Sequence, residues 1–310
     1  MAEFAIEIQN VSKTYGATTK ALDELSFSIP KGVICGVVGA NGAGKTTLYS
    51  VIAGYLPFDS GMISILGKGP FDIEEHQGKV SILPQDAELI PEMSIRQLLE
   101  YYARLQGIYG YKTEREVVRV LKNVDLIDKW ETETKISQLS HGMRRRVSVA
   151  QALLGEPELI LLDEPSAGLD PIQTANLRHI FMNKSPNTTM LISSHILSEL
   201  EEVCDYIVFM DKGKCTQHGF LSDLMGQTST VRIRFAGNID MVHLQKEIPH
   251  MQFQIEKDNL ICTQDVHNNI AQINALVLPY LLHHRIEIFE IQAGYRLSEH
   301  YERRTGEQGV

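Results

Sequence analysis

Short apolar segments alternate with polar ones along the first 67 residues. In each of these segments the apolar residues either form a continuous run or occupy every second position, and both patterns are typical of strands. The predicted strands are residues 4–8, 21–29, 33–38 and 61–65. Residues 48–52, directly after the third strand and a glycine-rich turn, have the pattern of a helix. This region therefore predicts strands that meet one helix.

The pattern changes after Asp86. From there to about Asp128, apolar residues recur at helical spacing, most clearly in residues 95–102 and 117–121, and we expect a helical insert. Apolar strands then return at residues 159–162, 189–193 and 206–210. They alternate with helical segments at residues 150–154, 173–182 and 197–203. That alternation predicts an α/β core in which most strands are parallel.

A new pattern begins near Gly226. Residues 230–235, 251–255, 259–262 and 286–291 predict strands, and residues 241–248 and 270–282 predict helices. The resulting order of strand, helix, two strands, helix and strand is that of a ferredoxin-like α+β unit. We therefore expect an α/β domain at residues 1–225, with a helical subdomain at about 86–140, and a small C-terminal domain at 226–310.

Composition excludes several classes of protein. The 310 residues carry 29 Lys and Arg against 39 Asp and Glu, a net charge of −10, which does not favour binding to nucleic acid. The four cysteines have no metal-binding or disulfide-framework spacing. We find no apolar run long enough to span a membrane and no N-terminal signal peptide. A reducing cytoplasm fits best, and any action on a membrane would need a partner.

The glycine-rich turn is a candidate phosphate-binding loop. A strand precedes it and a helix follows it, so its backbone N–H groups and the positive end of the helix would face an anion. Lys45 would reach the β- and γ-phosphates, and the hydroxyl of Thr46 would bind Mg²⁺. The alternative is a glycine-rich turn with a chance lysine. The nine residues of the loop are Gly39, Ala40, Asn41, Gly42, Ala43, Gly44, Lys45, Thr46 and Thr47.

Chemically active side chains follow the neighbouring strands. Asp163 and Glu164 end the apolar strand 159–162, where Asp163 could hold Mg²⁺ and Glu164 could polarise the attacking water. His195 follows strand 189–193 and would arrive at the same edge, where it could contact the γ-phosphate, although a histidine in such a place is often structural. The amide of Gln85 could touch both the metal and the water.

These residues resemble the nucleotide-binding subunit of ATP-binding cassette (ABC) transporters over about residues 4–219. In that family an upstream aromatic residue stacks on adenine, and Tyr15 has that place. The sequence Leu-Ser-His-Gly-Met at residues 139–143 has the place of the LSGGQ signature, and residues 166–170 form a further family segment that ends in Asp170. The resemblance implies a P-loop NTPase fold, ATP and Mg²⁺ as cofactors, and a nucleotide contact for Asp170.

The signature departs from the family pattern at His141 and Met143. The resemblance implies that Ser140 and Gly142, at the start of a helix, bind the γ-phosphate held by a second subunit. Since both are present, we expect a competent signature, and a degenerate, inactive half-site is the alternative. We interpret the arginines at residues 144–146 as a solvated helix face, and the alternative is a specific role in which some of them support the phosphate site.

A site divided in this way implies a pair of subunits, and we expect a homodimer that closes around two ATP molecules. The resemblance further implies separately encoded integral-membrane permease subunits, a position at the cytoplasmic face of the membrane and, from the length and added domain, an exporter of the ABC-2 type. Residues 91–95 and 101–105 could meet the permease or pack within the insert. The second domain could assist dimerisation or regulation. A soluble ABC ATPase acting on protein or nucleic-acid machinery is the alternative, and a binding module without turnover is disfavoured by Asp163, Glu164 and His195.

Overall fold

The computed structural model describes residues 4–16, 18–224, 228–265 and 270–293. Contacts divide the chain into two compact units, Met1–Phe220 and Leu221–Val310. The division follows residue 220, whereas the sequence pattern placed the boundary after residue 225.

A six-stranded sheet of the described residues forms the centre of the first unit. Five neighbouring strands of this sheet are parallel, and the sixth, at one edge of the sheet, is antiparallel to its neighbour. Every residue of β3 (Ile34–Val38), β6 (Leu159–Leu162) and β7 (Thr189–Ser193) is buried, as expected when both faces of a parallel sheet are covered. In spatial order the strands are β5 (Val80–Leu83), β6 (Leu159–Leu162), β7 (Thr189–Ser193), β3 (Ile34–Val38), β8 (Tyr206–Asp211) and β9 (Lys214–Phe220).

A second sheet of the described part of this unit has three antiparallel strands in the order β2 (Thr19–Pro30), β1 (Phe4–Tyr15) and β4 (Ser60–Ile65). Strand β1 is longer than the sequence pattern indicated, because the polar pair at residues 9 and 10 interrupts the apolar alternation. Asn10 has a φ of 51°, and the strand pairing shifts register there. Apolar residues of this sheet pack with helix α1 (Lys45–Ile52) in one core.

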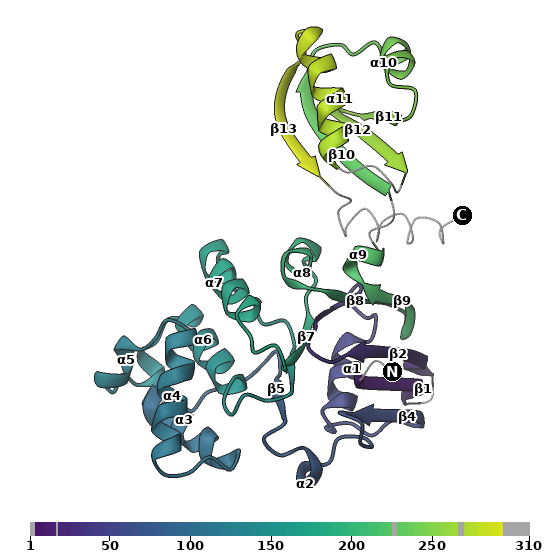
Figure 1. The fold of residues 1–310 in the computed structure, drawn as a ribbon. Coiled ribbons are helices and arrows are strands. Elements are labelled where there is room, and N and C mark those ends of the chain that lie inside the picture. Colours follow the sequence, from purple (N-terminus) through teal and green to yellow (C-terminus); the bar gives the residue numbers. More distant parts are fainter. Residues whose placement is uncertain (1–3, 17, 225–227, 266–269, 294–310) are drawn as a thin grey trace. The chain divides into compact units, whose positions relative to one another are not determined.

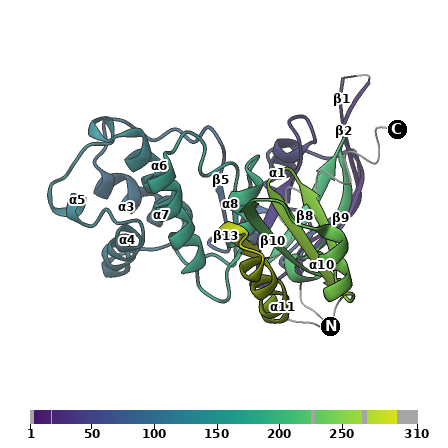
Figure 2. The same ribbon diagram turned by 90° about the horizontal axis from the view of Figure 1, so that it is seen from above.

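Helices at residues 95–152 pack together beside the sheets (Figures 1 and 2). The Ser94 side chain caps helix α3 (Ile95–Leu105) by accepting from the Gln97 N–H, and the Gln97 side chain accepts from the Ser94 N–H. Helix α6 (His141–Ala152) packs against both α3 and α4 (Tyr111–Asn123). The helical group therefore extends beyond residue 140. Its members are α3 (Ile95–Leu105), α4 (Tyr111–Asn123), α5 (Asp128–Glu131), the 3-10 turn η1 (Ile136–Gln138) and α6 (His141–Ala152).

Three further helices belong to the first unit, α2 (Ile73–His76), α7 (Pro171–Met182) and α8 (Leu197–Val203). Across the residues that the structure describes, no helix combines the length and the apolar character needed to cross a membrane.

The second unit contains the predicted ferredoxin-like arrangement. After the short helix α9 (Leu221–Leu224), its described strands form an antiparallel sheet in the order β11-β12-β10-β13. Apolar residues of this sheet and of its two helices form a separate core. The elements are β10 (Thr228–Ala236), α10 (Met241–Glu247), β11 (Gln252–Glu256), β12 (Asn259–Asp265), α11 (Ile270–His283) and β13 (Glu287–Ala293).

Candidate nucleotide-binding and catalytic site

The glycine-rich loop connects β3 to α1. A methyl group at Gly39 would lie 2.6 Å from the carbonyl oxygen of Met210, and one at Gly44 would lie 2.4 Å from that of Ala21. Gly44 also has a φ of 100°, a conformation that L side chains rarely adopt. Helix α1 begins at Lys45 rather than at residue 48, so the last three residues of the loop form its first turn. Its free N–H groups therefore lie at the loop.

Lys45 has an unusual environment for an ammonium group. It is 8% exposed, and its Nζ donates to the carbonyl oxygens of Gly39, at 2.6 Å, and Ala40, at 3.3 Å. Burial lowers the pKa of Lys45, and the nearby carboxylates of Glu164 and Asp163 oppose that effect. A partly desolvated cation at the end of a loop of N–H donors is suited to phosphate.

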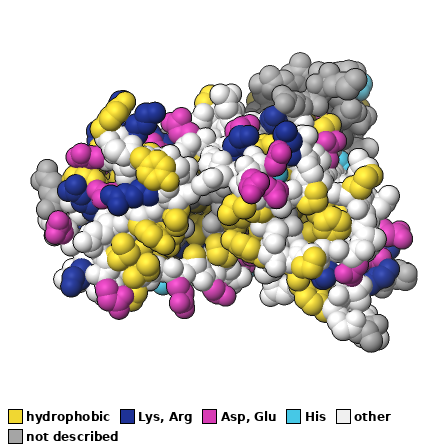
Figure 3. Space-filling view, turned by 90° about the horizontal axis from the view of Figure 1, so that it is seen from below, with side chains coloured by type: hydrophobic (Ala, Val, Ile, Leu, Met, Phe, Trp, Pro, Cys, Tyr) yellow, Lys and Arg dark blue, Asp and Glu magenta, His cyan; other side chains and the backbone are white. Residues whose placement is uncertain are grey.

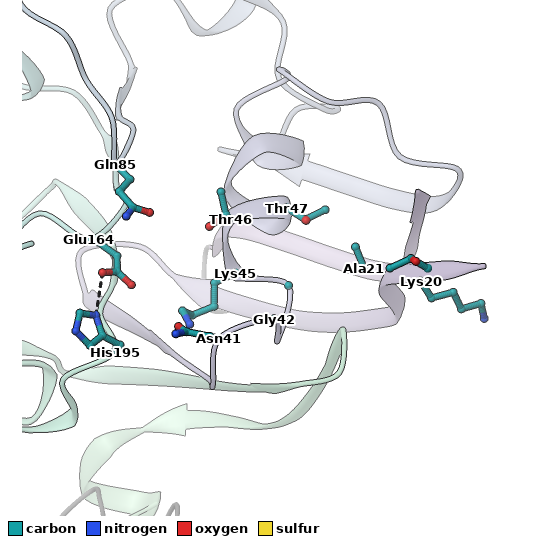
Figure 4. Close-up of a pocket in the computed structure, with 12 residues that line it drawn as sticks. Lys20, Ala21, Asn41, Gly42, Lys45, Thr46, Thr47, Gln85, Glu164 and His195 are labelled. Carbon is teal, nitrogen blue, oxygen red and sulfur yellow. Dashed lines mark hydrogen bonds and ion pairs between the residues drawn. The ribbon is translucent and has the colours of Figure 1, made fainter. Parts of the chain in front are cut away.

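A cavity of about 520 Å³ opens over this loop. Figure 4 shows Gln85, Glu164 and His195 on one side of it and the loop on the other, with the side chains of Gln85 and Glu164 directed toward Lys45. Gln85, Glu164 and His195 follow the ends of β5, β6 and β7, where the sequence pattern predicted them. The residues around it are Thr19, Lys20, Ala21, Asn41, Gly42, Gly44, Lys45, Thr46, Thr47, Gln85, Glu164 and His195.

Ser193 connects Asp163 with Glu164, and His195 contacts Glu164 directly. The Ser193 hydroxyl donates to Oδ1 of Asp163 at 2.5 Å and accepts from the Glu164 N–H at 2.8 Å. Nδ1 of His195 lies 2.9 Å from Oε2 of Glu164. Burial raises the pKa of the Asp163 carboxyl, and the Ser193 hydrogen bond opposes that effect. The chain can therefore place a carboxylate supported by an imidazole next to the phosphate loop.

The predicted Mg²⁺ donors are all oxygen atoms, which suits a hard cation. Thr46 and Gln85 line the cavity, and Asp163, 4% exposed, lies directly before Glu164 at the end of β6. Among the described residues, no group of three or more His, Cys, Asp or Glu side chains could hold a metal. One carboxylate, one hydroxyl and one amide, with phosphate oxygens added, is a donor set that fits Mg²⁺ but not a metal that prefers sulfur or nitrogen.

Among the described residues that line the cavity, neither Tyr15 nor Asp170 is present. Tyr15 ends β1 and is 46% exposed, while the cavity is lined by the following strand from Thr19 to Ala21. The Asp170 side chain accepts from the Gln173 N–H at 2.9 Å and caps α7.

The signature residues also lie outside this cavity. Ser140 is exposed and caps α6 by accepting from the Met143 N–H at 3.2 Å. A methyl group at Gly142 would lie 2.1 Å from Oε1 of Gln173, and one at Gly168 would lie 3.0 Å from Cε1 of His141. His141, which departs from the family pattern, and Gly142, which retains it, thus lie close to Gly168 and Gln173 respectively.

The interpretation of the three arginines as a solvated face is wrong for two of them. Arg144 is exposed, but Arg145 is 8% exposed and donates to the carbonyls around the site, and Arg146 donates to Val124 O at 3.0 Å and Asp125 O at 3.1 Å. Three adjacent positions on a helix point in three directions, so a run of identical residues cannot all share one face. Ser193 was also missed, and its only sequence signal is its place before Ser194 and His195.

Known proteins are similar to this chain in sequence. Residues 22–167 match the sequence profile of the family described as ABC transporter. The chain is 32% identical to the ABC transporter ATP-binding protein YhaQ of Bacillus subtilis over 86% of this chain and 89% of that protein. It is 30% identical to the Nod factor export ATP-binding protein I of Paraburkholderia xenovorans over 88% of this chain and 91% of that protein.

A solved structure is similar as well. It is cbiO1 of Clostridium perfringens, described as part of the ABC transporter complex cbiONQ, with 26% identity and a TM-score of 0.63 over 72% of this chain and 90% of that one.

Proposed function

The chain belongs to the ABC transporter family of ATP-binding ATPase subunits, and we propose that two copies of it bind and hydrolyse two ATP molecules between them and so drive a separate membrane permease. The observation that carries the proposal is the cavity in which the phosphate loop faces Gln85, Glu164 and His195. A loop alone supports binding, whereas the carboxylate and imidazole opposite it support hydrolysis.

The residues of the cavity suit an in-line attack of water on the γ-phosphorus. Lys45 and the N–H groups at the start of α1 hold the β- and γ-phosphates. Glu164 accepts a proton from the attacking water as the bond to the β–γ bridging oxygen breaks, and His195 orients the Glu164 carboxylate through the contact of 2.9 Å. Bound Mg²⁺, held by Thr46, Gln85 and Asp163, would neutralise the charge that develops on the phosphate oxygens.

The position of the signature supports a paired arrangement. Ser140 is exposed at the N-terminus of α6 and outside its own chain's cavity, and helix N-termini favour anions. In a pair, each chain would lend this helix end to the ATP held by the other. ATP then stabilises the closed pair because only that state contacts it from both sides, and hydrolysis with phosphate release favours opening.

Exposed aromatic and apolar groups of the helical subdomain support a permease contact. Tyr101 is 47% exposed and Leu105 54%, and Tyr109 and Tyr111 are more exposed still, whereas Ile95 is fully buried and packs within the insert. Hydrophobic side chains gather in patches on the face seen in Figure 3. We propose that Tyr101, Leu105, Tyr109 and Tyr111 belong to a surface that meets a permease at the cytoplasmic face of the membrane. The similarity to a Nod factor export protein supports an exporter.

The proposal is tested in two parts. Lys45→Ala should abolish ATP binding, measured by titration calorimetry, and wild-type affinity would contradict the assignment of the loop. For the permease, the chain should remain in the membrane fraction when co-expressed with a candidate membrane subunit. A Tyr101→Ser/Leu105→Ser variant should be released, whereas Tyr55→Ser, which changes a tyrosine 68% exposed elsewhere, should be retained. Equal retention of the wild-type chain and of both variants would contradict the proposed contact surface.

A further inference from the structure

Arg145 extends from α6 into the backbone of the site. Its Nε donates to Pro165 O at 2.8 Å, and Nη2 donates to Glu164 O at 2.8 Å and Asp163 O at 3.2 Å. Nη1 donates to Gln85 O at 3.2 Å. One buried guanidinium thus connects the segment that carries Gln85 with the segment that carries Glu164.

This arrangement is uncommon for a buried arginine. Burial lowers the pKa of Arg145, and the charges of Asp163 and Asp86 oppose that effect. The four groups to which its guanidinium donates are carbonyl oxygens rather than a carboxylate. Hydrogen bonds from a charged donor are roughly twice as strong as those between neutral groups. The four carbonyls therefore compensate for the lost hydration of the cation, and they are in turn held in place by it.

Glu164 is the residue that most needs such support. Its φ is 46°, in the left-handed region that residues other than glycine seldom adopt. Ser193 accepts from its N–H, Arg145 donates to its C=O, and His195 contacts its carboxylate. Both peptide groups beside its Cα are thereby fixed, and their orientation decides where the carboxylate points.

We infer that Arg145 is a positioning residue that holds Glu164 and Gln85 in their catalytic orientation and makes that orientation depend on α6. Arg145 lies five positions after Ser140, the residue that caps the same helix. A displacement of α6 moves both, so contact between Ser140 and the ATP of a second subunit is transmitted to the base. This inference rests on the proposed roles of Glu164 and of the paired site.

Arg145→Lys is the test, because it keeps the charge while a single ammonium cannot reach all four carbonyls. We expect kcat for ATP hydrolysis to fall by about 100-fold, the typical effect of a displaced catalytic group, with ATP affinity and ATP-dependent dimerisation unchanged. Arg146→Lys is the matched control, since Arg146 lies on the same helix and donates to carbonyls of Val124 and Asp125, away from the site. It should hydrolyse ATP at the wild-type rate.

A double variant shows whether Arg145 acts through Glu164. Adding Arg145→Lys to Glu164→Gln should cause no further loss of single-turnover hydrolysis, because residues that act as a unit are not additive. Independent, multiplying losses would overturn the inference, and so would an unchanged kcat in Arg145→Lys alone. Equal losses in Arg145→Lys and Arg146→Lys, or unfolding of Arg145→Lys in circular dichroism, would assign Arg145 to subdomain stability instead. Normal hydrolysis by Glu164→Gln itself would instead refute the role of Glu164 as the base, on which the inference rests, and this result is obtained without any change at Arg145.

Discussion

Replacing Glu164 by Gln isolates the proposed base from the rest of the site. The amide has nearly the shape of the carboxylate and keeps an oxygen 2.9 Å from Nδ1 of His195. The backbone contacts of Glu164 with Ser193 and Arg145 do not involve its side chain. The side chain is only 16% exposed, so the amide should remain in the same place. What is lost is the ability to accept a proton.

The expected effect follows from that single loss. A positioned general base contributes about 10²- to 10⁴-fold to the rate, and each factor of ten corresponds to about 1.4 kcal/mol of activation free energy. We therefore expect kcat to fall by the same factor, or about 3–5 kcal/mol. ATP affinity should be unchanged or higher, because the substitution removes a negative charge beside the phosphate site.

Two measurements check this prediction. Phosphate release under saturating Mg·ATP gives kcat, and light scattering during gel filtration shows whether ATP holds a dimer that no longer opens. Glu114→Gln, an exposed carboxylate on α4, is the control for loss of one negative charge. A normal kcat in Glu164→Gln would place the base elsewhere. Loss of ATP binding would show that Glu164 holds the nucleotide rather than activating water.

Three further outcomes are expected. Gly39→Ala should destabilise the fold by about 1–3 kcal/mol, because its methyl group would lie 2.6 Å from Met210 O, whereas Gly69→Ala, with open space around it, should have little effect on the thermal midpoint. Burial raises the pKa of Cys215 to about 11 from the ordinary 9.0. Its labelling by a thiol reagent should therefore increase with pH up to about 11, and its contribution to stability should be lost as pH rises above 9, where the unfolded thiol ionises first. An unchanged labelling rate between pH 8 and 10 would contradict this environment. Deleting residues 226–310 should alter dimer stability or permease-coupled turnover, and unchanged values for both would remove a regulatory role for the second unit.

Local patterns were sufficient for the fold and for much of the site. A phosphate loop depends on residues that are adjacent in the chain. The loop around Lys45 can therefore be recognised without the tertiary structure. Asp163, Glu164 and His195 could be placed because they directly follow apolar strands, and parallel strands end at one edge of a sheet. The second half of β1 was missed because Gln9 and Asn10 break the alternation at a shift in register.

Other features depend on contacts that no local pattern encodes. Arg144, Arg145 and Arg146 are identical in type and adjacent in sequence, yet only Arg145 donates to the backbone of the site. The rotation of α6 where it packs against β5 decides which of the three faces the site. Ser193 acts on Asp163, 30 residues away in the chain, and is an ordinary strand residue until β6 and β7 pair.

The amino-acid sequence by itself therefore determined the phosphate loop, the carboxylate and imidazole chemistry and the order of elements in both units, since each depends on near neighbours or strand ends. Only the tertiary structure decided how Glu164 is held. Its left-handed backbone is stabilised by groups from two other elements, and the distance between those groups is set by the packing of a helix against a sheet.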